Sequence, residues 1–130
     1  MSPKQFIDAQ KDERRGIMHS LHQIIIDRDK TIMPEVELMM GNQMIVYKER
    51  GHMKYALASG KNYMSLHCMP MYGSPQLHAK YINLIPAATF QKGCINFNNL
   101  DSMPLDVVDN LVQDCAKVSI AIMIENRIKK

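Results

Sequence analysis

Apolar residues recur with helical spacing in the N-terminal part of the chain. The segment Ser2–Gln5 has the order of an N-cap serine, a first-turn proline and a capping-box glutamine, which predicts a short helix as far as Ala9. The segment Asp12–Asp29 predicts a second, amphipathic helix, because its apolar residues form one stripe at i, i+4, i+7 and i+8. The residues of this stripe are Ile17, Leu21, Ile24 and Ile25.

A third, short helix is predicted to begin at Pro34, since proline is favoured in the first turn of a helix. Its apolar side would consist of Val36, Met39 and Met40. Gly41 would end it, as glycine commonly does at a helix C-terminus.

Short segments rich in β-branched, aromatic and methionine residues follow. The segments are Gln43–Glu49, Met53–Ser59 and Asn62–Met69. Arg50-Gly51 and Gly60-Lys61 separate them and have the composition of tight turns, so the pattern predicts a three-stranded meander. Lys92–Phe97 is a predicted fourth strand.

Two further helices are predicted in the second half of the chain. Ser74-Pro75 begins one of them and Pro86 ends it; its apolar side is Leu77, Tyr81, Leu84 and Ile85. Pro104 begins the other, with Val108, Leu111, Val112, Cys115 and Val118 or Ser119 on one face. Residues 118–124 also alternate as a strand does, so the pattern leaves the end of this helix open.

The turn lengths predict which strand residues share a face. With two-residue turns, Glu49 lies opposite His52, and Ser59 lies opposite Asn62. The predicted core face is Met44, Val46, Met53, Tyr55, Leu57, Met64, Leu66 and Cys68. The predicted opposite face is Ile45, Tyr47, Lys54, Ala56, Ala58, Tyr63, Ser65 and His67.

These elements predict an α+β fold in one domain that spans residues 1–130. A mostly antiparallel sheet of four or more strands would pack its apolar face against N-terminal helices and a C-terminal helix. That arrangement leaves the other face of the sheet open to a ligand or a partner.

Charge and composition exclude several classes of protein. Sixteen basic and thirteen acidic residues give a net charge of +3 without a basic block, so we expect no nucleic-acid partner. Ile120–Ile124 is the longest apolar run, and we expect no membrane partner. The N-terminus lacks an apolar leader segment, and three cysteines without a C-x-x-C pair argue against a disulfide framework or a zinc site, so we expect a reduced, cytoplasmic protein.

Several local strings resemble the YdhG-like domain-of-unknown-function family over about residues 12–117. The strings are Pro34-Glu35, Gly41, Arg50-Gly51, Lys61–Leu66, Lys92–Phe97 and Pro104-Leu105. The resemblance implies a small antiparallel sheet packed on helices, similar to frataxin. It also implies a non-enzymatic protein, with iron handling as a role given to part of the family. Asn42–Met44 departs from the family, which has a proline and an aromatic residue there.

His19 and His22, one helical turn apart, are the candidate metal ligands by spacing, with Asp12 on the same side. Iron is the metal that the resemblance implies, and no cofactor follows from the residues themselves. Arg15 lies one turn before His19, where its charge opposes a cation. The alternative is that both histidines are solvated surface residues.

Tyr47, Lys54, Tyr63 and His67 form a candidate ligand site on the open sheet face. In the predicted register, Tyr47, Lys54 and His67 lie side by side, and they offer hydrogen bonds and a positive charge to a small molecule or a protein partner. The alternatives are an ordinary wetted sheet face and an enzyme with Lys54 or His67 as its base.

We predict no catalytic residues, because the chain has none of the standard nucleotide-binding, hydrolase or metalloprotease motifs. Cys68 and Cys115 fall on core stripes, and Cys94 should point away from the core, so all three are interpreted as structural. The apolar end of the chain is wider than one packing stripe, which leads to the hypothesis of a homodimer through Ile120, Ile122, Met123 and Ile124.

Overall fold

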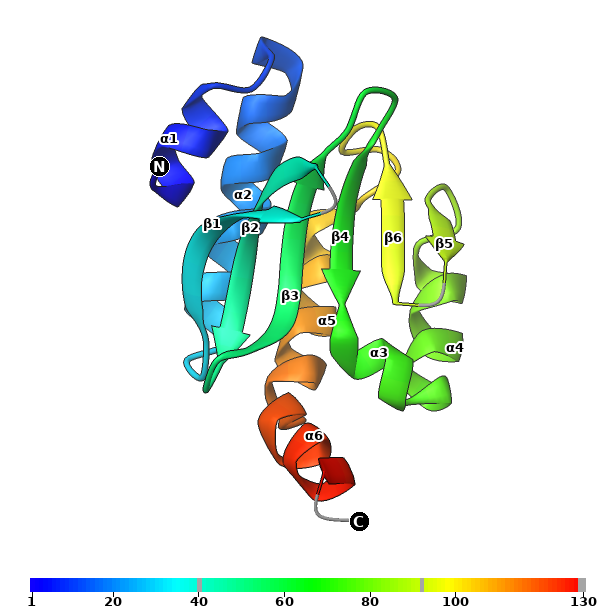
Figure 1. The fold of residues 1–130 in the computed structure, drawn as a ribbon. Coiled ribbons are helices and arrows are strands. Elements are labelled where there is room, and N and C mark those ends of the chain that lie inside the picture. The colour runs from blue at the N-terminus through cyan, green and yellow to red at the C-terminus, as the bar shows by residue number, and fades with distance from the viewer. Residues whose placement is uncertain (40, 92, 129–130) are drawn as a thin grey trace.

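The structure is a computed structural model that describes residues 1–39, 41–91 and 93–128. Its helices are α1 (Pro3–Asp8), α2 (Asp12–Arg28), α3 (Met69–Gly73), α4 (Pro75–Leu84), α5 (Leu105–Ala116) and α6 (Ile120–Ile128). Its strands are β1 (Met33–Met39), β2 (Asn42–Glu49), β3 (His52–Ser59), β4 (Met64–Cys68), β5 (Thr89–Gln91) and β6 (Cys94–Phe97). The six strands form one sheet in the order β1-β2-β3-β4-β6-β5, with every neighbouring pair antiparallel (Figure 1). The predicted α+β class is confirmed.

Local sequence signals account for the N-terminal helices. Ser2 caps α1: its Oγ accepts a hydrogen bond from the Gln5 amide at 3.1 Å, and the Gln5 side chain accepts one from the Ser2 amide at 2.8 Å. This is the predicted capping box. Helix α2 buries the predicted Ile17, Leu21 and Ile25.

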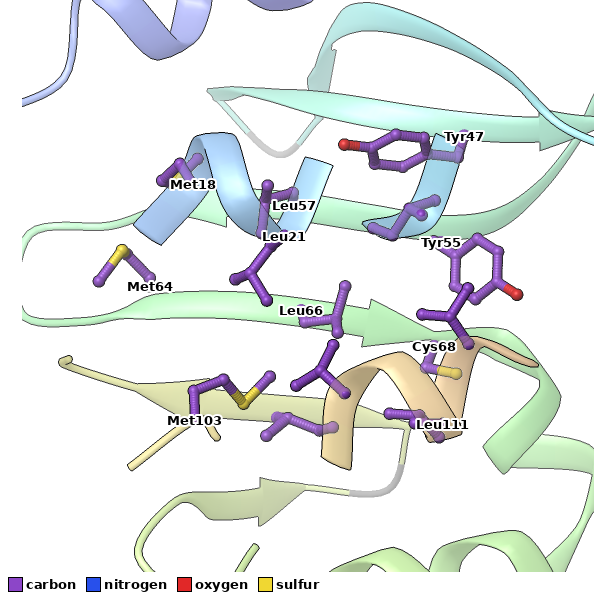
Figure 2. Close-up of a cluster of buried hydrophobic side chains, with 14 of the residues drawn as sticks. Met18, Leu21, Tyr47, Tyr55, Leu57, Met64, Leu66, Cys68, Met103 and Leu111 are labelled. Atoms are coloured by element: carbon purple, nitrogen blue, oxygen red, sulfur yellow. The ribbon is translucent and has the colours of Figure 1, made fainter. Parts of the chain in front are cut away.

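The core lies between the sheet and helices α2 and α5, which lie together on one side of it (Figure 1). Val108, Leu111, Val112 and Cys115 of α5 are buried there, as predicted. Figure 2 shows side chains of α2, the sheet and α5 packed in the same layer, among them Met18, Leu21, Leu57, Leu66 and Leu111. The core therefore covers one face of the sheet, and in the described part of the chain no helix covers the other (Figure 1).

The predicted helix at Pro34 is wrong, because residues 33–39 form the edge strand β1. This strand pairs with β2 from Met33 opposite Lys48 to Met39 opposite Asn42. An edge strand tolerates a proline because one of its sides needs no ladder hydrogen bonds. Gly41, with φ +81°, lies in the turn between the two strands, and Met40 lies outside the described residues.

A β-bulge overturns the predicted faces of β2. Glu49 lies opposite His52 as predicted, but Tyr47 lies opposite Tyr55, so Lys54 is the extra residue of β3. Ile45 and Tyr47 consequently face the core, where Figure 2 shows Tyr47 near Tyr55.

The predicted core residues Met44, Val46 and Met53 lie instead in a separate cluster with Ala56. The other predicted core residues are buried in the main core as expected; they are Tyr55, Leu57, Met64, Leu66 and Cys68.

The second turn differs from the prediction without changing the faces. Ser59 lies opposite Met64, two residues later than the predicted Asn62. Because side chains alternate with a period of two, a shift of two residues leaves every side chain of β4 on its predicted face.

The remaining elements differ from the prediction in their bounds and their number. Strand β6 begins at Cys94, while Lys92 lies outside the described residues, and β5 and α3 had no clear sequence signal. Helix α5 ends at Ala116, and the separate helix α6 begins at Ile120. Ile120 and Ala121 are buried within their own chain, whereas Ile122 is 52% exposed. The surplus apolar surface proposed for a homodimer is therefore smaller than the sequence implies.

Candidate functional site

The open face of the sheet has an apolar middle on β2 and β3, with a charged edge on β1 and polar residues on β4, β6 and β5. Two rows of paired residues cross it: Glu35–Val46–Ala56–His67–Cys94–Gln91 and Glu37–Met44–Ala58–Ser65–Asn96–Thr89. Strands β2 and β3 contribute only aliphatic or methionine side chains to these rows, whereas β4, β6 and β5 contribute only side chains with polar groups or a thiol. The sheet thus presents a surface on which apolar and polar residues adjoin, although Val46 and Ala56 are themselves buried.

This surface is hollowed into a groove of about 350 Å³. The described residues that line it are Met39, Asn42, Met44, Ala58, Ser59, Gly60, Lys61, Asn62, Tyr63, Ser65, His67, Gln91, Cys94 and Asn96. The β3–β4 loop forms one wall, because four residues separate these strands instead of two. A volume of this size lies at the lower end of the range of roughly 300–1,000 Å³ that small-molecule sites occupy.

Hydrogen bonds hold the polar side chains of the groove in place. His67 Nδ1 lies 3.0 Å from Cys94 Sγ. Ser65 Oγ donates to Asn96 Oδ1 at 2.6 Å, and Asn96 Nδ2 donates to Gln91 Oε1 at 3.2 Å. The chain of contacts orients the Asn96 amide and leaves its second N–H to other acceptors.

Partial burial keeps His67 and Cys94 uncharged at neutral pH. Burial lowers the pKa of His67, since the imidazolium loses hydration. Burial likewise raises the pKa of the Cys94 thiol, and a hydrogen bond from the Tyr72 hydroxyl partly offsets this rise. The Tyr72 ring packs against Gly93, where a Cβ atom would lie 2.3 Å from its Cδ2.

The predicted ligand residues divide between the two sides of the sheet. Tyr63 and His67 line the groove. Tyr47 and Lys54 are completely buried and do not contribute to it, because the bulge at Lys54 changes the register. The predicted row of Tyr47, Lys54 and His67 is therefore wrong.

The sequence analysis did not identify Cys94 as the contact partner of His67. Cys94 points away from the core as predicted, and its neighbour Ile95 is buried. The sequence does not show that β4 pairs with β6, which places Cys94 opposite His67, 27 positions earlier in the chain. Alternation alone gives the side of a strand, but it does not identify the strand beside it.

Lys54 belongs to a buried charged cluster. Its Nζ lies 2.8 Å from Asp29 Oδ2 and 3.8 Å from Glu49 Oε1, and the Tyr55 hydroxyl donates to Asp29 Oδ2 at 2.8 Å. Burial alone would raise the pKa of Asp29, but hydrogen bonds from Lys54 and Thr31 outweigh it and hold that pKa below its usual value. Fully enclosed and ion-paired, Lys54 is not placed to act as a base on a substrate.

The candidate metal ligands Asp12, His19 and His22 do not converge. His22 Nδ1 lies 2.7 Å from the Tyr47 hydroxyl, and Asp12 forms an ion pair with Arg15. Within residues 1–39, 41–91 and 93–128, no group of three or more histidine, cysteine, aspartate or glutamate side chains is arranged to hold a metal ion.

The fold and the groove together define a class of protein: an α+β domain with one helix-covered sheet face and one hollowed, partly polar face. No family model, curated protein or solved structure matches the chain. Of the helices in the described part of the chain, none has both the length and the apolar composition needed to span a membrane.

Proposed function

We propose that the protein is a binding domain that holds a small amphipathic organic molecule in the groove on the open sheet face. The observation that carries this proposal is that one groove combines an apolar strip, formed by Met39, Met44 and Ala58, with polar side chains. An apolar group of the ligand would lie over Met44 and Ala58, and its polar group would form hydrogen bonds with Ser65, Asn96 or Tyr63. A small molecule is favoured over a protein partner because the surface is hollow.

Protein-detected NMR with hexanamide as the probe tests this function. Hexanamide combines a short apolar chain with one amide, which matches the apolar strip and the polar side chains of the groove. We expect its addition to shift the amide signals of Ala58, Ser65, His67 and Asn96. Shifts confined to the helix-covered side, or no shifts at all, would contradict the proposal.

A matched pair of alanine variants localises the binding. Ala58→Phe places a ring in the groove without touching the main core, and we expect it to abolish the hexanamide response. Ala79→Phe adds the same ring to the exposed surface of α4 and should bind like the wild type. Equal binding by both variants would place the probe outside the groove.

Iron handling, which the YdhG-like resemblance implies, stays a prediction. Anaerobic ferrous iron added to the same labelled protein tests it, because a paramagnetic ion broadens nearby signals. Broadening around Asp12, His19 and His22 would support iron binding by the predicted residues. A spectrum without site-specific broadening would remove that role.

A further inference from the structure

Cys94 and His67 form a thiol–imidazole pair in the groove. Their side chains project from directly opposite positions of β6 and β4, with Sγ and Nδ1 3.0 Å apart. Cys94 is partly exposed and lines the groove, whereas Cys68 and Cys115 are completely buried. Only Cys94 among the three thiols is thus open to a molecule bound on this face.

We propose that Cys94 is a nucleophile that accepts the acyl group of a small acyl thioester, with His67 as its general base. This inference rests on the proposed binding function and names the class of molecule that the groove receives. The geometry meets the first requirement of such a pair, which is a nucleophile and a base within hydrogen-bond reach.

The transfer balances without an oxidant or a reductant. His67 Nδ1 takes the proton of the Cys94 thiol while Sγ forms a bond to the thioester carbonyl carbon. The bond between that carbon and the original sulfur then breaks, and the proton passes from His67 to the leaving thiolate. The products are S-acylated Cys94 and a free thiol, and one thioester has replaced another.

The residues around the pair suit this substrate. The apolar strip of the groove, with Met39, Met44 and Ala58, lies beside the polar side chains and offers a surface to the acyl chain. Asn96, two positions after Cys94 on the same face, has an N–H that can donate to the carbonyl oxygen as negative charge develops there. The Tyr72 hydroxyl lowers the pKa of the Cys94 thiol and so favours the thiolate as it forms, although burial raises that pKa by more.

Cys94 and His67 are both uncharged before the reaction, which indicates when His67 takes the proton. Because burial disfavours both the thiolate and the imidazolium, the proton leaves Cys94 only as the new bond forms. The described titratable groups that face the pair or line its groove are Tyr63, Lys61 and Tyr72. Burial raises the pKa of Tyr72, so its hydroxyl stays protonated at neutral pH, and His67 Nδ1, 3.0 Å from Sγ, is the base.

The experiment is incubation of the full chain with the butyryl thioester of N-acetylcysteamine, followed by intact and peptide mass spectrometry. We expect one butyryl group per chain, located on Cys94, and a rate roughly 100 times that of free N-acetylcysteine. Cys94→Ala should abolish the modification, and Cys94→Ser provides a second, nearly isosteric variant. Butyrylation of Cys68 or Cys115 in place of Cys94 would overturn the proposal.

His67→Asn tests the base without removing the polar contact. The asparagine amide lies near the position of Nδ1 but cannot accept a proton at neutral pH, so we expect a rate roughly 100-fold lower than that of the wild type. The wild-type rate should be level above the pKa of His67, whereas the variant's rate should keep rising with pH as the thiol ionises. An unchanged rate and pH profile in His67→Asn would overturn the role of His67.

The hexanamide titration separates the two proposals. If hexanamide binds in the groove but Cys94 reacts no faster than N-acetylcysteine, the nucleophile inference fails and the binding function stands. If neither binding nor acylation occurs, both fail. Ala79→Phe, which adds a ring at an exposed position that does not line the groove, should be acylated at the wild-type rate.

Discussion

Lys54 Nζ lies 2.8 Å from Asp29 Oδ2, and neither side chain is exposed to solvent. The pair joins the residue that ends α2 to the bulge of β3. A buried ion pair is costly to break, because removal of one charge leaves the other without hydration or a partner. The bulge that places Lys54 beside Asp29 also turns Tyr47 into the core.

Lys54→Met should therefore destabilise the protein strongly. We expect the free energy of unfolding to fall by about 3–5 kcal/mol, because the Asp29 carboxylate is left buried without its cation. Urea denaturation followed by circular dichroism measures this loss. Lys80→Met is the matched control, since Lys80 is exposed and pairs with Asp114 at the surface; its loss should stay below about 1 kcal/mol. Similar losses in both variants would contradict the structural role of the buried pair.

Stability should decrease as the pH falls below neutrality, because His22 and His67 have lowered pKa values in the folded state. Burial lowers the pKa of His22, with a further contribution from the charge of His19, and burial lowers that of His67. Between the lowered folded pKa and the ordinary value of 6.5, the unfolded chain binds more protons than the folded one. The stability is therefore fully present above the unfolded pKa and is lost as the pH falls through this range.

Urea midpoints measured from about pH 7.5 to about pH 5 check this dependence. His22→Gln removes one of the two groups and should flatten the decline. A decline as steep as that of the wild type would show that His22 does not contribute.

Glu49→Gln should destabilise the N-terminal part of helix α6. The Glu49 carboxylate accepts hydrogen bonds from the Ile120 amide at 2.9 Å and from the Ser119 hydroxyl at 2.6 Å, at the N-terminus of the helix. Loss of the negative charge weakens both contacts and the interaction with the helix dipole, by about 1–3 kcal/mol in total. We expect faster amide hydrogen exchange in residues 120–126 and unchanged exchange at Leu57. Glu125→Gln, which removes only an exposed ion pair with Arg50, is the control and should leave both rates unchanged.

Two glycine substitutions should change stability in opposite directions. Gly16 lies inside α2 with no atom within 4 Å of an added Cβ, so Gly16→Ala should raise the free energy of unfolding by about 0.5–1 kcal/mol. A Cβ at Gly93 would lie 2.3 Å from the Tyr72 ring and 2.9 Å from the Cys68 carbonyl oxygen. Gly93→Ala should therefore cost about 1–3 kcal/mol and displace Tyr72 from Cys94. Thermal unfolding of the two variants measures both effects, and a stabilised Gly93→Ala would contradict this packing.

The sequence predicted the elements whose signals are local. The capping box at Ser2 and the apolar stripe from Ile17 to Ile25 identified α1 and α2, because a helix is specified by residues that lie within one or two turns of each other. Alternation identified β2, β3 and β4 for the same reason. Strand β1 was not predicted, because a proline such as Pro34 occurs both in the first turn of a helix and in an edge strand. Only the pairing of this segment with β2 distinguishes the two structures.

The composition of the candidate site depends on strand register and strand pairing, which short stretches of sequence do not specify. Tyr63 and His67 were placed on the open face from sequence, because the longer turn shifted β4 by two residues and preserved its faces. Tyr47 and Lys54 were misplaced, because a bulge of one residue exchanges the faces of the strand on one side of it.

The sequence by itself determined helices α1, α2, α4 and α5, the meander, and the apolar and polar sides of β4 and β6, all of which follow from the spacing of neighbouring residues. The tertiary structure alone decided the bulge at Lys54 and the contact between His67 and Cys94. The bulge accompanies a buried ion pair with Asp29, and the contact requires β6 to pair with β4. Both depend on residues far apart along the chain that meet only when the core between the sheet and its two helices has formed.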